Sequence, residues 1–288
     1  PDEVIVKTAD TDASGKDLGV GGGRATVSLG AASAAACGEV RDKLLGVASQ
    51  MLQTKAEDLV IKNGRIEING KPGSGTTIQT VIAQCELDFG PVSGSGAFTA
   101  PGIAAMPGCA AGHFIDAIDI PVHAVHDCEL AIDSDTGHIE VISYRIVQDV
   151  GRALNPRAIH SQIQGGVVQG LGYALHEEIT INEHGAFDQQ GFETYRIPTA
   201  LDVLPIGCEL HEGAPSCGPF GVKGAGEIPI LNVGAAIACA VANATGQPVS
   251  KLPLTPPRVL EVIDGKDQAF DFTYIDRDWS KNTIGFSK

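Results

Sequence analysis

The sequence predicts an α+β fold, in which hairpin sheets pack against helices rich in glycine and alanine. Two hairpin signals predict the sheets, one at Asn63-Gly64 and one at residues 133–137. Apolar residues at helical spacing predict long helices over residues 29–52 and 157–178. The small and apolar residues 231–246 predict a buried helix that ends at a glycine.

Composition excludes several classes of partner. The chain has 288 residues, with 43% hydrophobic and 19% charged residues, which is ordinary for one large globular domain or two small ones. The formal net charge of −15 argues against nucleic acid or an anionic membrane as a partner, because phosphate binding needs clustered cations. We expect no membrane span and no signal peptide. The chain begins as if already close to a strand, which suggests a fragment or one subunit of a split protein.

The seven cysteines do not form a recognisable framework. Their number is odd and no two form a CxxC pair, which argues against disulfides, a zinc ribbon or an iron–sulfur cluster within the chain. We expect Cys37, Cys128 and Cys239 to lie in the core, and a reducing cytoplasm is the default compartment. The histidines show no ligand spacing, so the sequence predicts no metal-ligating side chains.

The N-terminal part combines a short predicted strand at residues 4–7 with a glycine-rich loop. Gly21-Gly22-Gly23 directly precedes Arg24, so the backbone N–H groups and the guanidinium could together hold an oxyanion. A flexible surface loop is the alternative interpretation. The alanine-rich half of the following helix is expected to pack tightly inside the protein.

The remaining predicted elements are two short helices, three strands and one long loop. A helix is expected over 76–85, and the glycine- and proline-rich residues 89–112 are expected to form a long ordered loop. Strands are expected over 122–132, 138–150 and 206–210, and a last short helix from about 257 to 263.

The predicted helix over 157–178 is unusual because it contains four glycines in its interior. Asn155 is a plausible cap with Pro156 at the first helical position. Each interior glycine costs about 1 kcal/mol relative to alanine. Two interpretations therefore stay open, namely close packing of another backbone, or a ligand bound beside the glutamines. The residues concerned are Gln162, Gln164, Gly165, Gly166, Gln169, Gly170 and Gly172.

Glu227 follows a glycine-rich stretch and directly precedes the last long apolar run. A lone carboxylate among small residues at the start of a helix is a candidate general base. A glutamate that merely caps the helix after a glycine turn is the alternative interpretation.

Four segments, taken in this order and spacing, resemble the molybdenum-binding subunit of the xanthine oxidase family of molybdenum hydroxylases. They are DVGRALNP (149–156), SQIQGGVVQGLGYALHEE (161–178), TYRIPTALD (194–202) and GVKGAGEIPILNVGAAIACAVANATG (221–246). The resemblance covers residues 1–263 and corresponds to the second molybdopterin-binding domain of that family. Residues 264–288 form a tail without a counterpart.

The resemblance implies roles for particular residues. Glu227 matches the catalytic glutamate, which in that family takes a proton from a hydroxyl bound to molybdenum. Gly226 matches a residue beside the metal, and Gln162 a glutamine that contacts the pterin. The loop Gly22-Gly23-Arg24-Ala25 matches a backbone segment that holds the pterin dithiolene and its phosphate.

The resemblance also implies an activity and partners. The implied cofactor is a molybdenum–pterin group, either molybdopterin or its cytosine dinucleotide form. The implied reaction inserts water-derived oxygen at an electrophilic carbon of a heteroaromatic ring or an aldehyde. Partner chains would supply the other half of the molybdenum subunit, the iron–sulfur clusters and FAD. Two alternatives stay open: a non-catalytic subunit that holds the cofactor or assists assembly, and a relative of carbon monoxide dehydrogenase.

Overall fold

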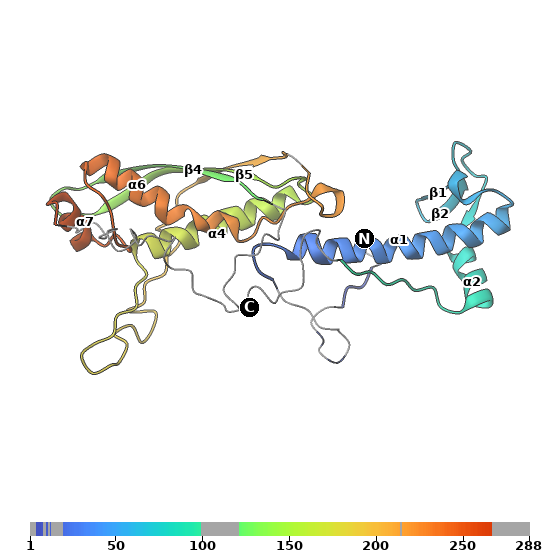
Figure 1. The fold of residues 1–288 in the computed structure, drawn as a ribbon, viewed down its shortest axis with the longest axis horizontal. Coiled ribbons are helices and arrows are strands. Elements are labelled where there is room, and N and C mark those ends of the chain that lie inside the picture. Colours follow the sequence, from blue (N-terminus) through green and yellow to red (C-terminus); the bar gives the residue numbers. More distant parts are fainter. Residues whose placement is uncertain are drawn as a thin grey trace, which may run out of the picture. The chain divides into compact units, whose positions relative to one another are not determined.

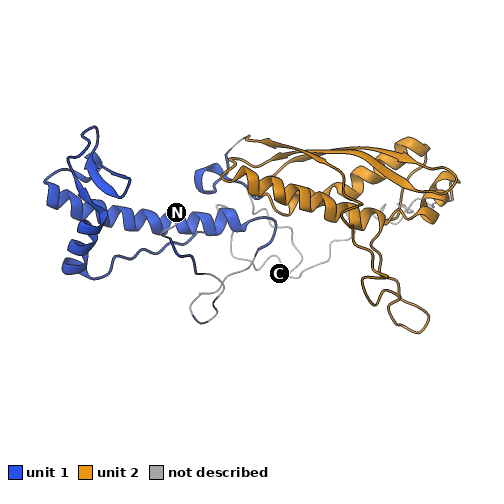
Figure 2. Cartoon of the chain, turned by 180° about the vertical axis from the view of Figure 1, so that it is seen from behind, with its two compact units in different colours: residues 1–121, 214–224 blue, residues 122–213, 225–288 orange. Residues whose placement is uncertain are grey.

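A computed structural model describes residues 4–7, 10, 12, 20–98, 121–213 and 215–266. The chain divides into two compact units (Figure 2). Unit 1 comprises Pro1–Pro121 and Ala214–Gly224, and unit 2 comprises Val122–Gly213 and Ala225–Lys288. Most of the expected loop at 89–112 and of the tail at 264–288 lies outside the described residues.

Unit 1 is built around one long helix, α1 (Ala25–Leu52), and a small antiparallel sheet. The sheet contains β1 (Leu59–Lys62), β2 (Arg65–Ile68) and β3 (Thr76–Thr77), and is followed by α2 (Ile78–Phe89). The hairpin turn is confirmed: Asn63 and Gly64 have φ of 49° and 73°, the left-handed values that an Asn-Gly turn permits. The short helices η1 (Ala56–Asp58) and η2 (Pro219–Gly221) complete the unit. Its core comprises Leu44, Val47, Ala48, Leu59, Ile66, Val81 and Cys85.

Several expectations for burial were wrong. Residues 4–7 form no strand and are exposed. In the alanine-rich half of α1 only Val27 is buried, although Gly94 and Gly96 lie directly against the backbone of this half. Cys37 and Cys239 are exposed, whereas Cys128 packs against the core of unit 2. Composition alone could not show this, because alanine and cysteine suit an exposed helix face as well as a core.

Unit 2 is a three-stranded sheet with helices on one face. Antiparallel strands β4 (Ala124–Ile132) and β5 (Ile139–Asp149) confirm the second hairpin, and β6 (Ile206–His211) adds in parallel to β5. Helices α4 (Pro156–Leu175) and α6 (Val233–Thr245) lie against the same face of this sheet (Figure 1). The remaining helices are α5 (Ile228–Leu231) and α7 (Pro256–Ile263).

Two predicted helix ends are confirmed in unit 2. The side chain of Asn155 accepts a hydrogen bond from the backbone N of Ala158 at 3.1 Å and so caps α4. Helix α4 ends at Leu175, three residues before the expected position. Gly246 ends α6 with a φ of 69°, a left-handed value that favours glycine.

The glycines of α4 allow close helix packing. A Cβ on Gly166 would lie 2.8 Å from Cβ of Pro229, and a Cβ on Gly170 would lie 2.5 Å from Cβ of Val233. Helices α5 and α6 therefore approach α4 more closely than any side chain would permit. Gly165 differs, because a Cβ there would meet nothing within 4 Å. Close packing explains Gly166 and Gly170 but not Gly165.

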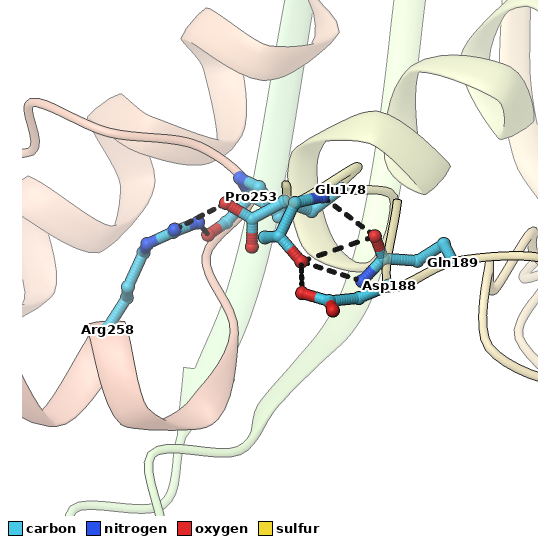
Figure 3. Close-up of polar contacts among 6 residues, drawn as sticks. Glu178, Asp188, Gln189, Pro253 and Arg258 are labelled. Carbon is cyan, nitrogen blue, oxygen red and sulfur yellow. Dashed lines mark hydrogen bonds and ion pairs between the residues drawn. The ribbon is translucent and has the colours of Figure 1, made fainter. Parts of the chain in front are cut away.

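Residues 176–205 follow α4. Near its start, this segment is joined to α7 by a contact between Glu178 and Arg258 (Figure 3). Arg258 of α7 donates to Glu178 at 2.6 Å and to the carbonyl oxygen of Pro253 at 3.0 Å. Farther along, the hydroxyl of Thr180 donates to Asp188 at 2.6 Å, and its backbone N donates to Gln189 at 2.7 Å. The Arg258–Glu178 contact therefore joins the start of the segment to α7, whereas the bonds of Thr180 lie within the segment.

One stretch of unit 2 has the length and apolar composition of a membrane span. It is Ile228–Thr245, of which 33% is buried. This corrects the expectation that no apolar run in the chain reaches that length. Helices in the cores of soluble proteins have the same length and composition, so this stretch does not by itself indicate a membrane span.

A polar pair lies within the core between β4 and β5. The Nδ1 atom of His126 is 2.8 Å from the hydroxyl of Tyr144, and Nε2 of His126 is buried without a hydrogen-bond partner among the described residues. Burial lowers the pKa of His126 from its ordinary value of 6.5, because desolvation disfavours the charged imidazolium.

We expect the unit 2 fold to lose stability as the pH falls below 6.5. The unfolded chain binds a proton at His126 near that pH, whereas the folded chain binds it only at lower pH. The His126→Phe variant should therefore show a flatter dependence of the free energy of unfolding on pH between 7.5 and 5. Urea denaturation at several pH values measures this. His123→Phe, at an exposed position just before β4, is the control and should keep the wild-type slope.

Candidate functional site

Glu227 lies at the start of α5 in a segment that we call the Glu227 segment, residues 225–232. Its side chain is exposed. The backbone occupies the position before the first helical residue, but the carboxylate makes no capping hydrogen bond. Helix α5 is also only four residues long. The helix-capping interpretation therefore does not account for a glutamate here.

Gly226 and Gln162 come together beside Glu227. A Cβ on Gly226 would lie 3.4 Å from Oε1 of Gln162, and both residues are exposed. One helical turn after Gln162, Gly165 leaves open space on α4. Bare backbone, an amide side chain and a carboxylate thus lie close to one another on unit 2. This arrangement offers hydrogen-bond donors and acceptors to a polar heterocycle.

The Glu227 segment is attached to the sheet at both ends. The side-chain N of Gln148, on β5, donates to the carbonyl oxygen of Ala225 at 3.2 Å. The side-chain N of Asn232 donates to the carbonyl oxygen of Ala124, on β4, at 3.5 Å. Our sequence analysis missed both residues. The available signal for Gln148 was a polar residue at an inward position of an alternating strand, after Tyr144 and Ile146.

The glycine loop of unit 1 leads directly into α1. Gly22 and Gly23 have φ of 61° and 70°, Arg24 precedes the helix, and Ala25 is its first residue. The first turn of α1 contains no acidic residue, so no side chain there offsets the partial positive charge of this helix end. Such an end attracts anionic groups, including phosphate.

Gly224 packs against this loop within unit 1. A Cβ on Gly224 would lie 2.5 Å from the carbonyl oxygen of Gly23, so no other residue fits there without displacing the loop. The preceding Lys223 is buried and donates to the carbonyl oxygen of Pro121 at 3.0 Å. Gly224 therefore keeps the shape of the loop that the sequence singled out.

The side chains that the structure describes do not form a metal site of their own. Within the described ranges, no three residues of the types His, Cys, Asp and Glu are placed to hold a metal ion. A metal held among the described residues would bring ligands with it, as a metal held by an organic cofactor does. The glycine loop and the N-terminus of α1 in unit 1, and separately the Gln162 amide in unit 2, each offer hydrogen-bond donors of the kind that such a cofactor needs.

Comparisons with known proteins identify the family of the chain. Residues 1–204 match the family of molybdopterin cofactor-binding domains. The gamma subunit of the 6-hydroxypseudooxynicotine dehydrogenase complex of Paenarthrobacter nicotinovorans is 31% identical over 272 residues, which is 93% of this chain and 33% of that protein. The nicotine 6-hydroxylase large subunit of the same organism is 32% identical and covers 92% of this chain and 32% of that protein.

Solved structures show the same fold. Cu,Mo-CO dehydrogenase matches with a TM-score of 0.77 at 23% identity, over 91% of this chain and 32% of that one. The aldehyde oxidoreductase of Desulfovibrio desulfuricans matches with a TM-score of 0.61 at 27% identity, over 84% of this chain and 23% of that one. This chain spans about a third of the length of the first two relatives. It is α+β, as predicted, and it belongs to the family of molybdopterin cofactor-binding domains, as its resemblance to the xanthine oxidase family implied.

Proposed function

We propose that this chain is the cofactor-binding part of a molybdenum hydroxylase or dehydrogenase. Its substrate would be a heteroaromatic ring or an aldehyde, which receives water-derived oxygen at an electrophilic carbon. The observation that carries the proposal is the exposed, non-capping carboxylate of Glu227 beside Gly226 and Gln162, in a molybdopterin-binding family. The relatives named as nicotine 6-hydroxylase and 6-hydroxypseudooxynicotine dehydrogenase support a heteroaromatic substrate.

Each residue has a separate part in this proposal. Glu227 accepts the proton released as the substrate is hydroxylated, because a carboxylate on open backbone can act as a general base. The amide of Gln162 hydrogen-bonds the pterin ring beside Gly226. Gly22, Gly23, Arg24 and Ala25 hold the anionic end of the cofactor through backbone N–H groups and a guanidinium. The molybdenum–pterin cofactor, as molybdopterin or its cytosine dinucleotide form, supplies the redox chemistry.

The proposal includes partners. This chain matches about a third of each of the longer relatives, so the remaining two thirds of the molybdenum subunit would come from the same polypeptide or from a second one. Iron–sulfur clusters and FAD would lie on further partner chains, because the cysteines offer no cluster site among the described residues. We propose a cytoplasmic complex of several chains.

Metal analysis of the purified complex tests this function. We expect stoichiometric molybdenum, which is lost when this chain is left out. The Gly224→Ala variant should lower molybdenum content several-fold, because its Cβ would lie 2.5 Å from the Gly23 carbonyl oxygen and displace the loop. Gly38→Ala, in the same unit and with nothing within 4 Å of its Cβ, is the matched control and should retain the metal.

The outcome separates the alternatives. Molybdenum that is present and tied to this chain, without turnover of any N-heteroaromatic compound, aldehyde or carbon monoxide, would identify a non-catalytic cofactor-holding subunit. Oxidation of carbon monoxide alone would identify the carbon monoxide dehydrogenase alternative. Absence of molybdenum from the wild-type complex would disprove the proposed function.

A further inference from the structure

We propose that Gln148 and Asn232 are positioning residues, which fasten the Glu227 segment to a single cross-strand pair of the sheet. Asn232 lies within the segment 221–246 that resembles the family, and Gln148 directly precedes another such segment, but the resemblance assigns a role to neither residue. The proposal rests on the proposed function, because it assigns Glu227 as the group that must be held in place. Its structural part concerns only residues of unit 2.

Gln148 holds the first residue of the Glu227 segment. Its side chain is fully buried, with 0% exposure, and extends from the face of β5 that also carries Tyr144 and Ile146. The amide N donates to the carbonyl oxygen of Ala225, which is 77 residues away in sequence, at 3.2 Å. Ala225 is two residues before Glu227, so this bond acts close to the carboxylate without touching it.

Asn232 holds the last residue of the same segment. Its amide N donates to the carbonyl oxygen of Ala124 at 3.5 Å, a long hydrogen bond that we expect to be the weaker of the two. Ala124 and Gln148 are direct partners in the antiparallel register of β4 and β5. Both ends of the Glu227 segment are therefore hydrogen-bonded to one cross-strand pair of the sheet, Ala124 and Gln148, at the first residue of β4.

The middle of the segment rests on α4. Pro229 lies against Gly166, where a Cβ would be 2.8 Å from the Cβ of Pro229. Pro229 is also buried, while Glu227 is exposed. The segment thus makes two hydrogen bonds to the sheet and one apolar contact with α4, between Pro229 and Gly166. Such an arrangement fixes the direction in which the exposed carboxylate leaves the backbone.

The side chain of Gln148 destabilises the fold in one respect, which an apolar side chain at this position would not. Its Oε1 atom is buried and has no hydrogen-bond partner among the described residues. A buried acceptor without a partner destabilises the fold, and an apolar side chain of the same shape would remove that cost. A glutamine at this position is therefore explained by what its N–H donor holds, not by packing.

The test compares Gln148→Met with wild type in the full chain by hydrogen–deuterium exchange. Methionine has a similar shape and removes both the donor and the unpartnered acceptor. We expect amides in peptides covering residues 225–232 to exchange about five- to tenfold faster, as the loss of one hydrogen bond predicts. The melting temperature should stay within a few degrees of wild type, because the unpartnered acceptor is lost as well. Asn232→Ala should give a smaller increase in the same peptides.

A matched control and a kinetic readout complete the test. Ile146→Met changes another fully buried side chain on the same face of β5, and should leave exchange at 225–232 unchanged. In the assembled enzyme, Gln148→Met should lower kcat by about 10- to 100-fold, with KM changed less than about threefold, because Glu227 is misplaced while substrate contacts remain.

Two results would overturn the proposal. One is unchanged exchange at 225–232 in Gln148→Met, and the other is an equal increase in Ile146→Met. A variant whose exchange rises but whose kcat is that of wild type would remove the positioning role and leave only the attachment. If the wild-type complex holds no molybdenum, the proposed function fails, whereas the exchange data still test the attachment of the Glu227 segment.

Discussion

Replacing Glu227 with glutamine is expected to lower turnover by about 10²- to 10⁴-fold, the contribution typical of a general base. Glutamine has nearly the same size and can still accept and donate hydrogen bonds, but it cannot take up a proton at neutral pH. Because Glu227 is exposed, the change does not bury a new polar group. We therefore expect molybdenum content and melting temperature close to wild type. The measurement is kcat and metal content of the purified complex, with N-heteroaromatic compounds and aldehydes as substrates.

The control for this prediction is Glu140→Gln, an exposed glutamate on β5 that takes no part in the proposed site. It should retain wild-type turnover. Normal turnover in Glu227→Gln would remove the base assignment while leaving cofactor binding untouched. Lost turnover together with lost molybdenum would instead show that Glu227 acts in holding the cofactor.

The second large effect is expected at Gly170, whose replacement with alanine should destabilise unit 2 by about 2 kcal/mol, within the usual range for overpacking. The added Cβ would lie 2.5 Å from Cβ of Val233, which is fully buried, so α6 would have to move away from α4. The better helix propensity of alanine, worth up to about 1 kcal/mol, offsets only part of this cost.

Gly165→Ala is the matched control for this prediction, in the same helix. Its Cβ would meet nothing within 4 Å, so only the gain in helix propensity remains, and stability should rise by up to about 1 kcal/mol. Urea denaturation of the full chain, followed by the helical circular dichroism signal, measures both changes. Equal effects at the two glycines would contradict the assignment of Gly170 to close packing and Gly165 to an open face.

Local features could be predicted well from the sequence. Asn63-Gly64 defines its hairpin because few other residue pairs adopt two left-handed conformations in succession. Asn155 and Gly246 mark helix ends through hydrogen bonding and conformation within a few residues. The sequence also contains enough family-specific residues around Glu227 to point to a molybdopterin-binding domain.

Burial and pairing between distant residues required the tertiary structure. The sequence showed four glycines in α4 with two open explanations, and only the positions of Pro229 and Val233 separate packing glycines from the open Gly165. The parallel addition of β6 to β5 is likewise a pairing between strands that the whole of α4 separates.

What the sequence by itself determined about this protein is therefore the set of elements, their ends and the carboxylate that the family pattern marks. The tertiary structure alone decided that Gln148 and Asn232 attach the segment carrying that carboxylate to one rung of the sheet. The physical reason is that turns and caps depend on neighbours within a few residues, whereas a hydrogen bond across 77 residues exists only after the chain has folded.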